Sequence, residues 1–182
     1  KQVDFYEEVT RVPMLFSGAG KEPQKEALIG LTSLLDLFPT LCGFADIAVP
    51  NGVRGMDLSA ALRGGALPQR DYVASEWHTE WGYTVSPGRM IRTPAYKYMR
   101  YIENGDTELY DMRSDPLEMH NLSKNPAYSA VCAQTETLLQ AHLRETQDDF
   151  EQLTVVADAR WRSHTPGYQN HTGIAAPQEK NG

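Results

Sequence analysis

The sequence predicts an α/β protein in two parts, because its hydrophobic period changes along the chain. Residues 9–16 form a near-continuous β-branched and apolar run, which is typical of a strand covered on both faces in a parallel sheet. From residue 71, apolar residues instead recur at every second position in four short segments, and a long helical pattern follows over residues 126–150. We therefore expect the end of an α/β layer, followed by a small four-stranded antiparallel sheet with one packed helix.

Two helices are expected in the first part of the chain, residues 1–70. Apolar residues within 37–47 recur with helical spacing, and Asp36 precedes them as a candidate N-cap. A shorter helix follows Asp57, also a candidate N-cap, and ends before Gly64-Gly65. The apolar residues of both helices favour a packing role.

The strand expected at residues 9–16 predicts that part of the protein lies upstream. A lone parallel strand cannot pair its own backbone groups or bury both of its faces, so its partner strands must come from elsewhere. The chain also begins at Lys1, with neither an initiator Met nor the regions of a signal peptide. We therefore expect residues 1–70 to be the C-terminal end of a large α/β domain whose N-terminal part is missing.

The second part, residues 71–150, is expected to be an antiparallel subdomain. Its predicted strands are residues 72–76, 89–93, 96–102 and 107–111. An Asn104-Gly105 pair between the last two strands is a strong hairpin signal. Residues 115–118 have the sequence of a capping box and predict one helical turn, and the helix of residues 126–150 would cover the sheet. Residues 151–182 show no sustained period and are expected to form an irregular tail.

Charge and composition exclude several classes of protein. With a net charge of -7 over 182 residues, the chain lacks the excess of Lys and Arg that a nucleic-acid-binding surface needs. The longest apolar stretch, residues 34–48, is too short and too often interrupted to span a membrane. Cys42 and Cys132 have no CxxC spacing, which favours free thiols over a disulfide.

Several short sequence motifs occur along the chain in a characteristic order. In the first part they are Lys1, Phe5-Tyr6-Glu7-Glu8, Arg11-Val12-Pro13-Met14-Leu15, Ser33 to Leu41 and Gly55-Met56-Asp57-Leu58. In the second part they are Arg89 to Thr93, Tyr96-Lys97-Tyr98, Glu108 to Asp111, Asp115-Pro116, Glu118 and Asn121-Leu122. In order and spacing these motifs resemble the C-terminal part of the type I sulfatases, enzymes of the alkaline phosphatase superfamily.

The resemblance implies an alkaline-phosphatase-like α/β sandwich that holds the active site, followed by the small subdomain. It also implies two cofactors, a calcium ion and a formylglycine made from the Cys or Ser of a Cys/Ser-X-Pro-X-Arg motif. Cys42 and Cys132 do not stand in such a motif, Ser86-Pro87-Gly88-Arg89 has the wrong spacing, and no acidic pair like the family's metal-binding motif is present. Both cofactors are therefore expected on residues absent from this chain, and no metal ligand is expected within it.

Lys1 is the one residue to which the resemblance gives a catalytic role. Sulfatases place a lysine shortly before the segment that matches residues 5–15, where its ammonium contacts the sulfate and the leaving oxygen. A compact cation suits this role because it stabilises the charge that builds up on a departing ester oxygen. In many family members this lysine stands one residue later, at the place of Gln2, and a solvated terminal lysine is the alternative.

Two other segments carry candidate substrate-binding residues. Trp77 and His78 begin an aromatic-rich loop between two strands, and aromatic planes beside hydrogen-bonding groups suit sugar rings. The alternative is a pair of tryptophans, Trp77 and Trp81, that holds the loop to the core. In the tail, His164 and His171 would reach substrate if the tail folded back over the pocket mouth, and a disordered tail is the alternative.

A local excess of basic residues lies within residues 81–102, which contain no Asp or Glu. Arg89, Arg92 and Arg100 could attract an anionic sulfated substrate. Because alternate residues of a strand point to opposite faces, these arginines cannot all converge, and we interpret them as a solvated outer face. Lys97 belongs to one of the motifs that resemble the family, and we interpret it as structural.

Taken together, the residues predict the C-terminal portion of a formylglycine-dependent sulfatase, a sulfuric ester hydrolase that is inactive without the missing N-terminal portion. The expected substrate is a sulfated small molecule or carbohydrate. The alternatives are a non-catalytic module that binds sulfated glycans, and a phosphodiesterase or phosphonate hydrolase of the same superfamily, because a shared fold does not determine function. Neither nucleic acid nor a membrane is an expected partner, and the resemblance makes a periplasmic or secreted location plausible.

Overall fold

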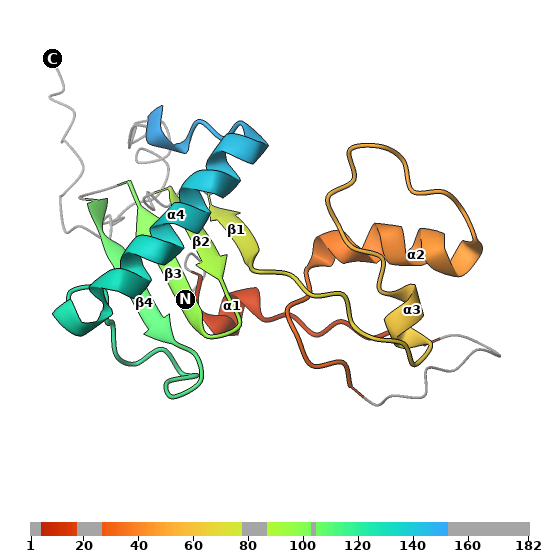
Figure 1. Ribbon diagram of the computed structural model, residues 1–182, viewed down its shortest axis with the longest axis horizontal. Coiled ribbons are helices and arrows are strands. Elements are labelled where there is room, and N and C mark those ends of the chain that lie inside the picture. The colour runs from red at the N-terminus through yellow and green to blue at the C-terminus, as the bar shows by residue number, and fades with distance from the viewer. Residues whose placement is uncertain (1–4, 18–26, 78–86, 103–104, 153–182) are drawn as a thin grey trace, which may run out of the picture. The chain divides into compact units, whose positions relative to one another are not determined.

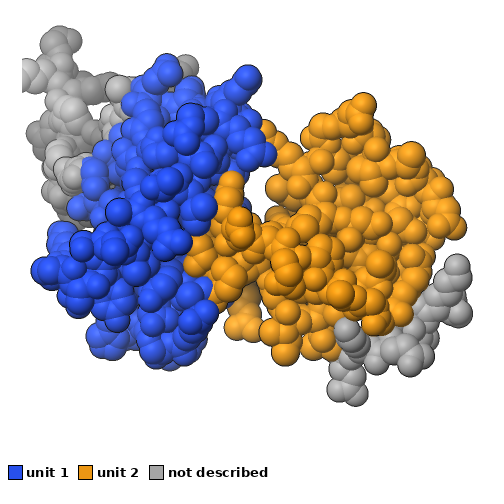
Figure 2. Space-filling model, in the orientation of Figure 1, with its two compact units in different colours: residues 1–10, 74–91, 95–182 blue, residues 11–73, 92–94 orange. Residues whose placement is uncertain are grey.

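A four-stranded sheet forms the centre of the second part of the chain. The computed structural model describes residues 5–17, 27–77, 87–102 and 105–152. The chain divides into two compact units, and each is described by itself (Figure 2). Unit 1 comprises residues 1–10, 74–91 and 95–182, and unit 2 comprises residues 11–73 and 92–94.

The strands of the sheet follow one another in sequence order. They are β1 (Val73–Trp77), β2 (Gly88–Arg92), β3 (Tyr96–Tyr101) and β4 (Thr107–Asp111), in the spatial order β1-β2-β3-β4 (Figure 1). β3 and β4 pair antiparallel, with Tyr98 opposite Leu109. Between them Gly105 has a φ of 61°, in the left-handed region that favours glycine. The antiparallel meander predicted from the period of two is confirmed.

α4 (Ser129–Thr146) covers one face of this sheet and packs against β3 (Figure 1). Its buried side chains are Thr135, Leu139 and Leu143. The helix predicted over residues 126–150 is divided into three, because η3 (Pro126–Tyr128) precedes α4 and η4 (Phe150–Gln152) follows it. α4 ends where Gln147 takes a left-handed φ of 55°.

The opposite face of the sheet packs on the segment that contains α1 (Glu7–Thr10). Side chains of β3 alternate between the two faces. The Tyr98 hydroxyl donates to Glu136 of α4 at 2.9 Å, whereas the next residue, Met99, is buried in the core cluster on the other face. That core cluster consists of Phe5, Met90, Met99, Tyr110 and Met112. Phe5 thus fixes the start of the described chain to the sheet.

Unit 2 is built from three short helical elements. They are η1 (Leu34–Asp36), α2 (Leu37–Ala45) and α3 (Ser59–Leu62). Asp36 stands at the N-cap position of α2, as expected, but its side chain makes no capping hydrogen bond to that helix. Its carboxylate instead completes a reciprocal capping box with Ser33, the N-cap of η1. The short helix expected after Asp57 is present as α3, but its N-cap position is Leu58 instead of Asp57. Asp57 stands one residue earlier, and its Oδ1 accepts from the Ser59 amide at 2.7 Å.

Buried polar contacts join the elements of unit 2. The Asp36 carboxylate is fully buried, and its Oδ1 accepts from Arg70 Nη2 at 2.7 Å and from the Met56 amide at 2.8 Å. Thr40 Oγ1 of α2 accepts from the Leu58 amide at 3.0 Å, just before α3. These contacts satisfy polar groups that would otherwise be buried without partners.

The expected strand at residues 9–16 is not present in the structure. Its first residues belong to α1, and residues 11–17 form neither helix nor strand. Leu15 is 92% exposed, although its apolar run predicts a strand covered on both faces. A strand needs a neighbouring strand to pair its amides and carbonyls, and the described residues provide none at this place.

Candidate functional site

Most of the residues with an expected site role lie outside the described residues. Lys1, His78, His164 and His171 fall in this category, so their catalytic or substrate-binding roles stay predictions. Trp77 is the exception and closes β1.

Trp77 is tied to unit 1 by its ring and by its backbone. Its half-buried ring packs against the core cluster, and its carbonyl accepts from Arg89 Nη1 at 2.9 Å. The indole Nε1 is buried and has no hydrogen-bond partner among the described residues. The ring therefore holds β1 to the core, which is the packing alternative for this tryptophan, and a substrate contact through it stays a prediction.

A group of three charged side chains, two of them buried and the third partly exposed, is the most unusual feature of unit 1, and we call it the charge cluster. Lys97 comes from β3, Glu7 from α1 and Glu118 from the turn that follows β4. Lys97 Nζ lies 2.7 Å from Glu7 Oε1 and 2.7 Å from Glu118 Oε1. The side chains of Lys97 and Glu118 are 0% and 1% exposed, so both charges are removed from water.

The charge cluster fixes the segment that begins at Phe5. Lys97 Nζ also donates to the Phe5 carbonyl at 2.8 Å, and Glu118 Oε2 accepts from the Glu7 amide at 2.6 Å. On the same face, Glu108 Oε2 of β4 accepts from the hydroxyls of Tyr6 at 3.0 Å and Tyr110 at 2.8 Å. Residues 5–7 are thus held to the sheet by both backbone and side-chain contacts.

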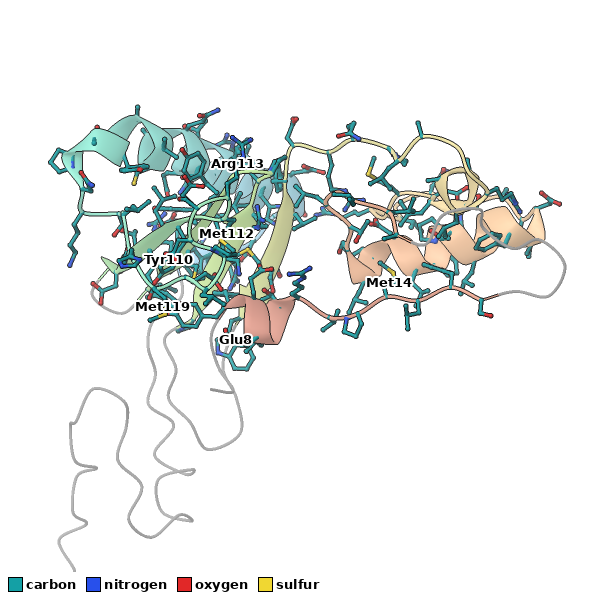
Figure 3. The ribbon with its side chains drawn as sticks, turned by 90° about the horizontal axis from the view of Figure 1, so that it is seen from below. Glu8, Met14, Tyr110, Met112, Arg113 and Met119 are labelled. Atoms are coloured by element: carbon teal, nitrogen blue, oxygen red, sulfur yellow. The ribbon has the colours of Figure 1, made fainter. Side chains whose placement is uncertain are left out.

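Glu118 belongs to the turn after β4, the segment in which Figure 3 labels Arg113 and Met119. Residues 115–118 form a turn instead of the helical turn that the capping box predicts. Asp115 accepts from the amides of Met119 at 3.0 Å and His120 at 2.8 Å, and these bonds lower the pKa of its carboxyl. Glu118 takes a left-handed φ of 55° and points its carboxylate to Lys97, so it does not cap the turn.

Arg89, from the basic stretch, does not lie on a solvated outer face. Arg89 is 3% exposed and holds Asp148 in a bidentate pair, with Nε to Oδ2 at 2.6 Å and Nη2 to Oδ1 at 2.8 Å. Its guanidinium also lies 4.7 Å from the ring centroid of Phe150. Arg100, on the same face, pairs with acidic residues of α4 and η4. α4 and the residues that follow it carry these acidic partners and cover this face of the sheet. The interpretation as a solvated surface is therefore wrong for Arg89.

Sequence reasoning marked Lys97 as structural but missed its two carboxylate partners. Glu7 and Glu118 lie 111 residues apart in the sequence, and each belongs to a motif that resembles the family. A lysine between tyrosines in a strand with a buried face was the available signal, because a charge in that position needs a partner.

The described residues do not fit either implied cofactor. Among them, no group of three or more His, Cys, Asp or Glu side chains lies close enough together to hold a metal ion. Cys42 and Cys132 are free thiols, as expected, and neither begins a formylglycine motif. Of the helices in the described part of the chain, none has the length and apolar character needed to cross a membrane.

Solved structures place this fold among the sulfatases. A structure described as a 2-O GAG sulfatase superimposes with a TM-score of 0.81 at 46% identity, covering 97% of this chain and 39% of that one. A phosphonate monoester hydrolase of Agrobacterium radiobacter matches less closely, with a TM-score of 0.52 at 26% identity over 64% of this chain and 26% of that one. The fold class and sulfatase resemblance expected from the sequence are confirmed.

The sequence comparisons define the family. A family model described as N-sulphoglucosamine sulphohydrolase, C-terminal, matches residues 2–147, and the chain belongs to this family of sulfatase C-terminal regions. It is 46% identical over 179 residues to the Delta 4,5-hexuronate-2-O-sulfatase of Bacteroides thetaiotaomicron. That match covers 97% of this chain but only 37% of the relative. An ulvan-active sulfatase of Formosa agariphila is 31% identical over 155 residues, covering 83% of this chain and 30% of the relative.

Proposed function

We propose that this chain is the C-terminal part of a sulfatase that hydrolyses a sulfate ester of a carbohydrate, with 2-O-sulfated, unsaturated hexuronate as the substrate class. The observation that carries the proposal is the 46% identity to the Delta 4,5-hexuronate-2-O-sulfatase across 97% of the chain. A structure related over a shorter part of the chain is described in complex with D-glucosamine-2-N,6-O-disulfate, which supports a sulfated carbohydrate as the substrate. The chain spans about a third of these relatives' length, and the activity belongs to the longer protein.

Within that protein, we assign Lys1 the role of stabilising charge on the leaving oxygen. The charge cluster supports this assignment, because it fixes the chain from Phe5 onward, four residues after Lys1. A cation in this role contributes most when its position is fixed before the reaction, since no reorganisation is then needed in the transition state. His78, Trp77, His164 and His171 are proposed to contact the sugar.

The nucleophile and the metal are proposed to come from upstream residues. The family's formylglycine supplies the nucleophile, and its calcium ion neutralises the sulfate oxygens. Because the described residues fit neither group, the chain by itself should release no sulfate.

A fusion protein tests the proposed function. The chain replaces the matching C-terminal region of the Bacteroides 2-O-sulfatase, and sulfate release is measured from an unsaturated 2-O-sulfated disaccharide. We expect turnover by the fusion and none by the 182-residue chain alone, with a chromogenic aryl sulfate and calcium as a second assay. A fusion that folds but releases no sulfate, or turnover by the chain alone, would contradict the proposal.

Lys1 is tested in the same fusion. Lys1→Ala should lower kcat by about 100-fold, the loss typical of removing one group that stabilises a developing oxyanion. Gln2→Ala is the matched control, because some family members carry the lysine at that place. A larger loss from Gln2→Ala than from Lys1→Ala would reassign the role to the neighbouring position.

The match to the phosphonate monoester hydrolase favours a second candidate function. The same fusion is therefore assayed with a phosphonate monoester. Turnover of the phosphonate above that of the sulfated disaccharide would replace the sulfatase proposal with this one.

A further inference from the structure

Three consecutive residues, Phe5, Tyr6 and Glu7, are each located by a different part of unit 1. The Phe5 ring lies in the core cluster, and the Tyr6 hydroxyl donates to Glu108 Oε2 at 3.0 Å. The Glu7 amide donates to Glu118 Oε2 at 2.6 Å. A shift of this segment by one residue would separate all three residues from these partners. The contacts therefore define the register of the segment on the sheet as well as its attachment.

Glu118 connects this register to the sheet. Its carboxylate uses both oxygens, because Oε1 lies 2.7 Å from Lys97 Nζ while Oε2 accepts from the Glu7 amide. Lys97 Nζ in turn lies within 2.8 Å of three oxygens, and an ammonium has three N–H groups to donate. Two of these oxygens belong to Phe5 and Glu7, so the lysine is directed to the same segment.

Stability alone does not account for the arrangement around Glu118. This residue has a left-handed φ of 55°, a conformation that a non-glycine residue keeps only where its surroundings impose it. The side chains of Lys97 and Glu118 are 0% and 1% exposed, and replacing such a buried ion pair by apolar residues of similar size often costs no stability. The best-attested use of buried polar and ionic groups is to fix the register of one segment against another.

We propose that Glu118 is a positioning residue for the sulfatase reaction, acting on Lys1 through Lys97 and residues 5–7. This inference rests on the proposed function of Lys1. Lys1 stands shortly before the fixed segment in the sequence, and a shift of one residue would bring Gln2 to its place. A cation stabilises a departing oxygen only from the correct position, and a misplacement of about 1 Å can lower a rate about 100-fold. Glu118 thus contributes to the rate through the position of Lys1.

A double-mutant cycle in the fusion protein tests this role. Glu118→Gln keeps the size of the side chain but leaves one acceptor oxygen where the carboxylate has two. With the unsaturated 2-O-sulfated disaccharide, we expect it to lower kcat about tenfold and to change KM by less than about threefold. In a Lys1→Ala background the same substitution should lower kcat less than about twofold, because the residue through which it acts is gone. All rates are divided by the folded fraction, measured by circular dichroism.

The dependence of the rate on the leaving group is a second readout, which a merely structural role would not change. A misplaced cation costs more when the departing oxygen carries more charge in the transition state. Glu118→Gln should therefore lower kcat/KM at least about threefold more for phenyl sulfate, which has the poorer leaving group, than for 4-nitrophenyl sulfate.

Glu136→Gln is the matched control for the change from carboxylate to amide. The Glu136 carboxylate also uses both oxygens, which accept from Tyr98 at 2.9 Å and from Arg100 at 2.8 Å, but it lies on the α4 face of the sheet. This substitution does not touch residues 5–7. Its kcat should therefore stay within about twofold of the unchanged fusion.

Tyr6→Phe is a milder variant that decides the question if Glu118→Gln does not fold. It removes the hydrogen bond to Glu108 and keeps the ring in place. We expect it to lower kcat about threefold in the unchanged fusion and to have no effect on kcat in the Lys1→Ala background.

Hydrogen exchange in the fusion separates this inference from the proposed function. Glu118→Gln should make the amides of residues 5–10 exchange at least about fivefold faster, because its single acceptor oxygen cannot serve both Lys97 and the Glu7 amide. A fusion that releases no sulfate but shows this faster exchange would contradict the proposed function and leave the register contact in place.

Three outcomes overturn the inference. They are an unchanged kcat of the folded Glu118→Gln fusion, an equal fold-loss of kcat with and without Lys1, and unchanged exchange of the amides of residues 5–10. The second outcome would assign Glu118 a structural role alone.

Discussion

Lys97 is a buried cation whose two carboxylate partners come from elements far apart in the sequence. Burying charges costs free energy unless they are paired, so removing one partner is much more damaging than removing a surface charge. The single lysine neutralises carboxylates from α1 and from the turn after β4. Its replacement would leave Glu118 buried without a cation.

We expect Lys97→Met to lower the free energy of unfolding by about 3–5 kcal/mol, the range found when a buried ion pair loses one member. The measurement is urea denaturation of the chain. Lys124→Met is the control, because Lys124 is exposed, and it should change stability by less than about 0.5 kcal/mol. Equal effects of the two substitutions would show that the charge cluster contributes nothing to stability.

Asp148 links stability to pH through its pair with Arg89. The hydrogen bonds from Arg89 lower the pKa of this carboxyl below its ordinary 3.8. The folded state therefore binds this proton less readily than the unfolded state. The contribution to stability is fully present above the unfolded pKa and is lost as pH falls through the folded pKa.

We expect the stability of the unchanged chain to fall between about pH 5 and pH 3 more steeply than that of Asp148→Asn, because the amide has no proton to gain. At neutral pH the variant should be the less stable of the two. Thermal unfolding at half-unit pH intervals measures both effects. Parallel pH profiles for the two proteins would contradict the assignment.

At the scale of elements, the segment Gly55-Met56-Asp57-Leu58 leads into α3 and packs its backbone closely against that of η1. A Cβ at Gly55 would lie 1.9 Å from the Leu35 carbonyl oxygen and 2.5 Å from its carbonyl carbon. Backbone atoms cannot move aside as a side chain can. The next residue, Met56, donates its amide to the buried Asp36 carboxylate, so displacement of Gly55 would also weaken this contact.

Gly55→Ala should therefore destabilise unit 2 by about 1–3 kcal/mol or more, as overpacking does in other well-packed sites. Gly52→Ala is the comparison, because a Cβ at Gly52 meets no atom within 4 Å and only its φ of 88° opposes the change. The two variants are compared by urea denaturation. A smaller effect at Gly55 than at Gly52 would mean that the loop shifts away from η1 at little cost.

At the scale of the whole molecule, local sequence patterns correctly predicted the elements whose backbone hydrogen-bond partners lie within the described part of the chain. The strands pair their backbone groups with one another and α4 pairs its own, so period and turn residues were sufficient signals. The apolar run at residues 9–16 was interpreted as a strand from the same kind of signal. It forms no strand, because a strand is defined by a neighbour that the described residues lack.

The candidate site was less predictable than the fold. The partners of Lys97 and Arg89 lie across tertiary contacts between segments that are distant in sequence. A single sequence gives the residue types and their spacing along the chain, but it does not give which buried cation meets which carboxylate. The left-handed conformation of Glu118 likewise has no signal in the residue types around it.

The two units should differ in stability when the chain is studied alone. In unit 1, α4 and the α1 segment cover the two faces of the sheet, whereas in unit 2 the outward side of α2 is exposed. Local opening is least costly where few apolar contacts are lost, and amide exchange reports this opening. We therefore expect the amides of α2 to exchange at least tenfold faster than those of β3 and α4, measured by hydrogen–deuterium exchange of the 182-residue chain. If α2 exchanged as slowly as β3, its inward contacts would be sufficient to stabilise it, and the exposure of its outward side would not weaken unit 2.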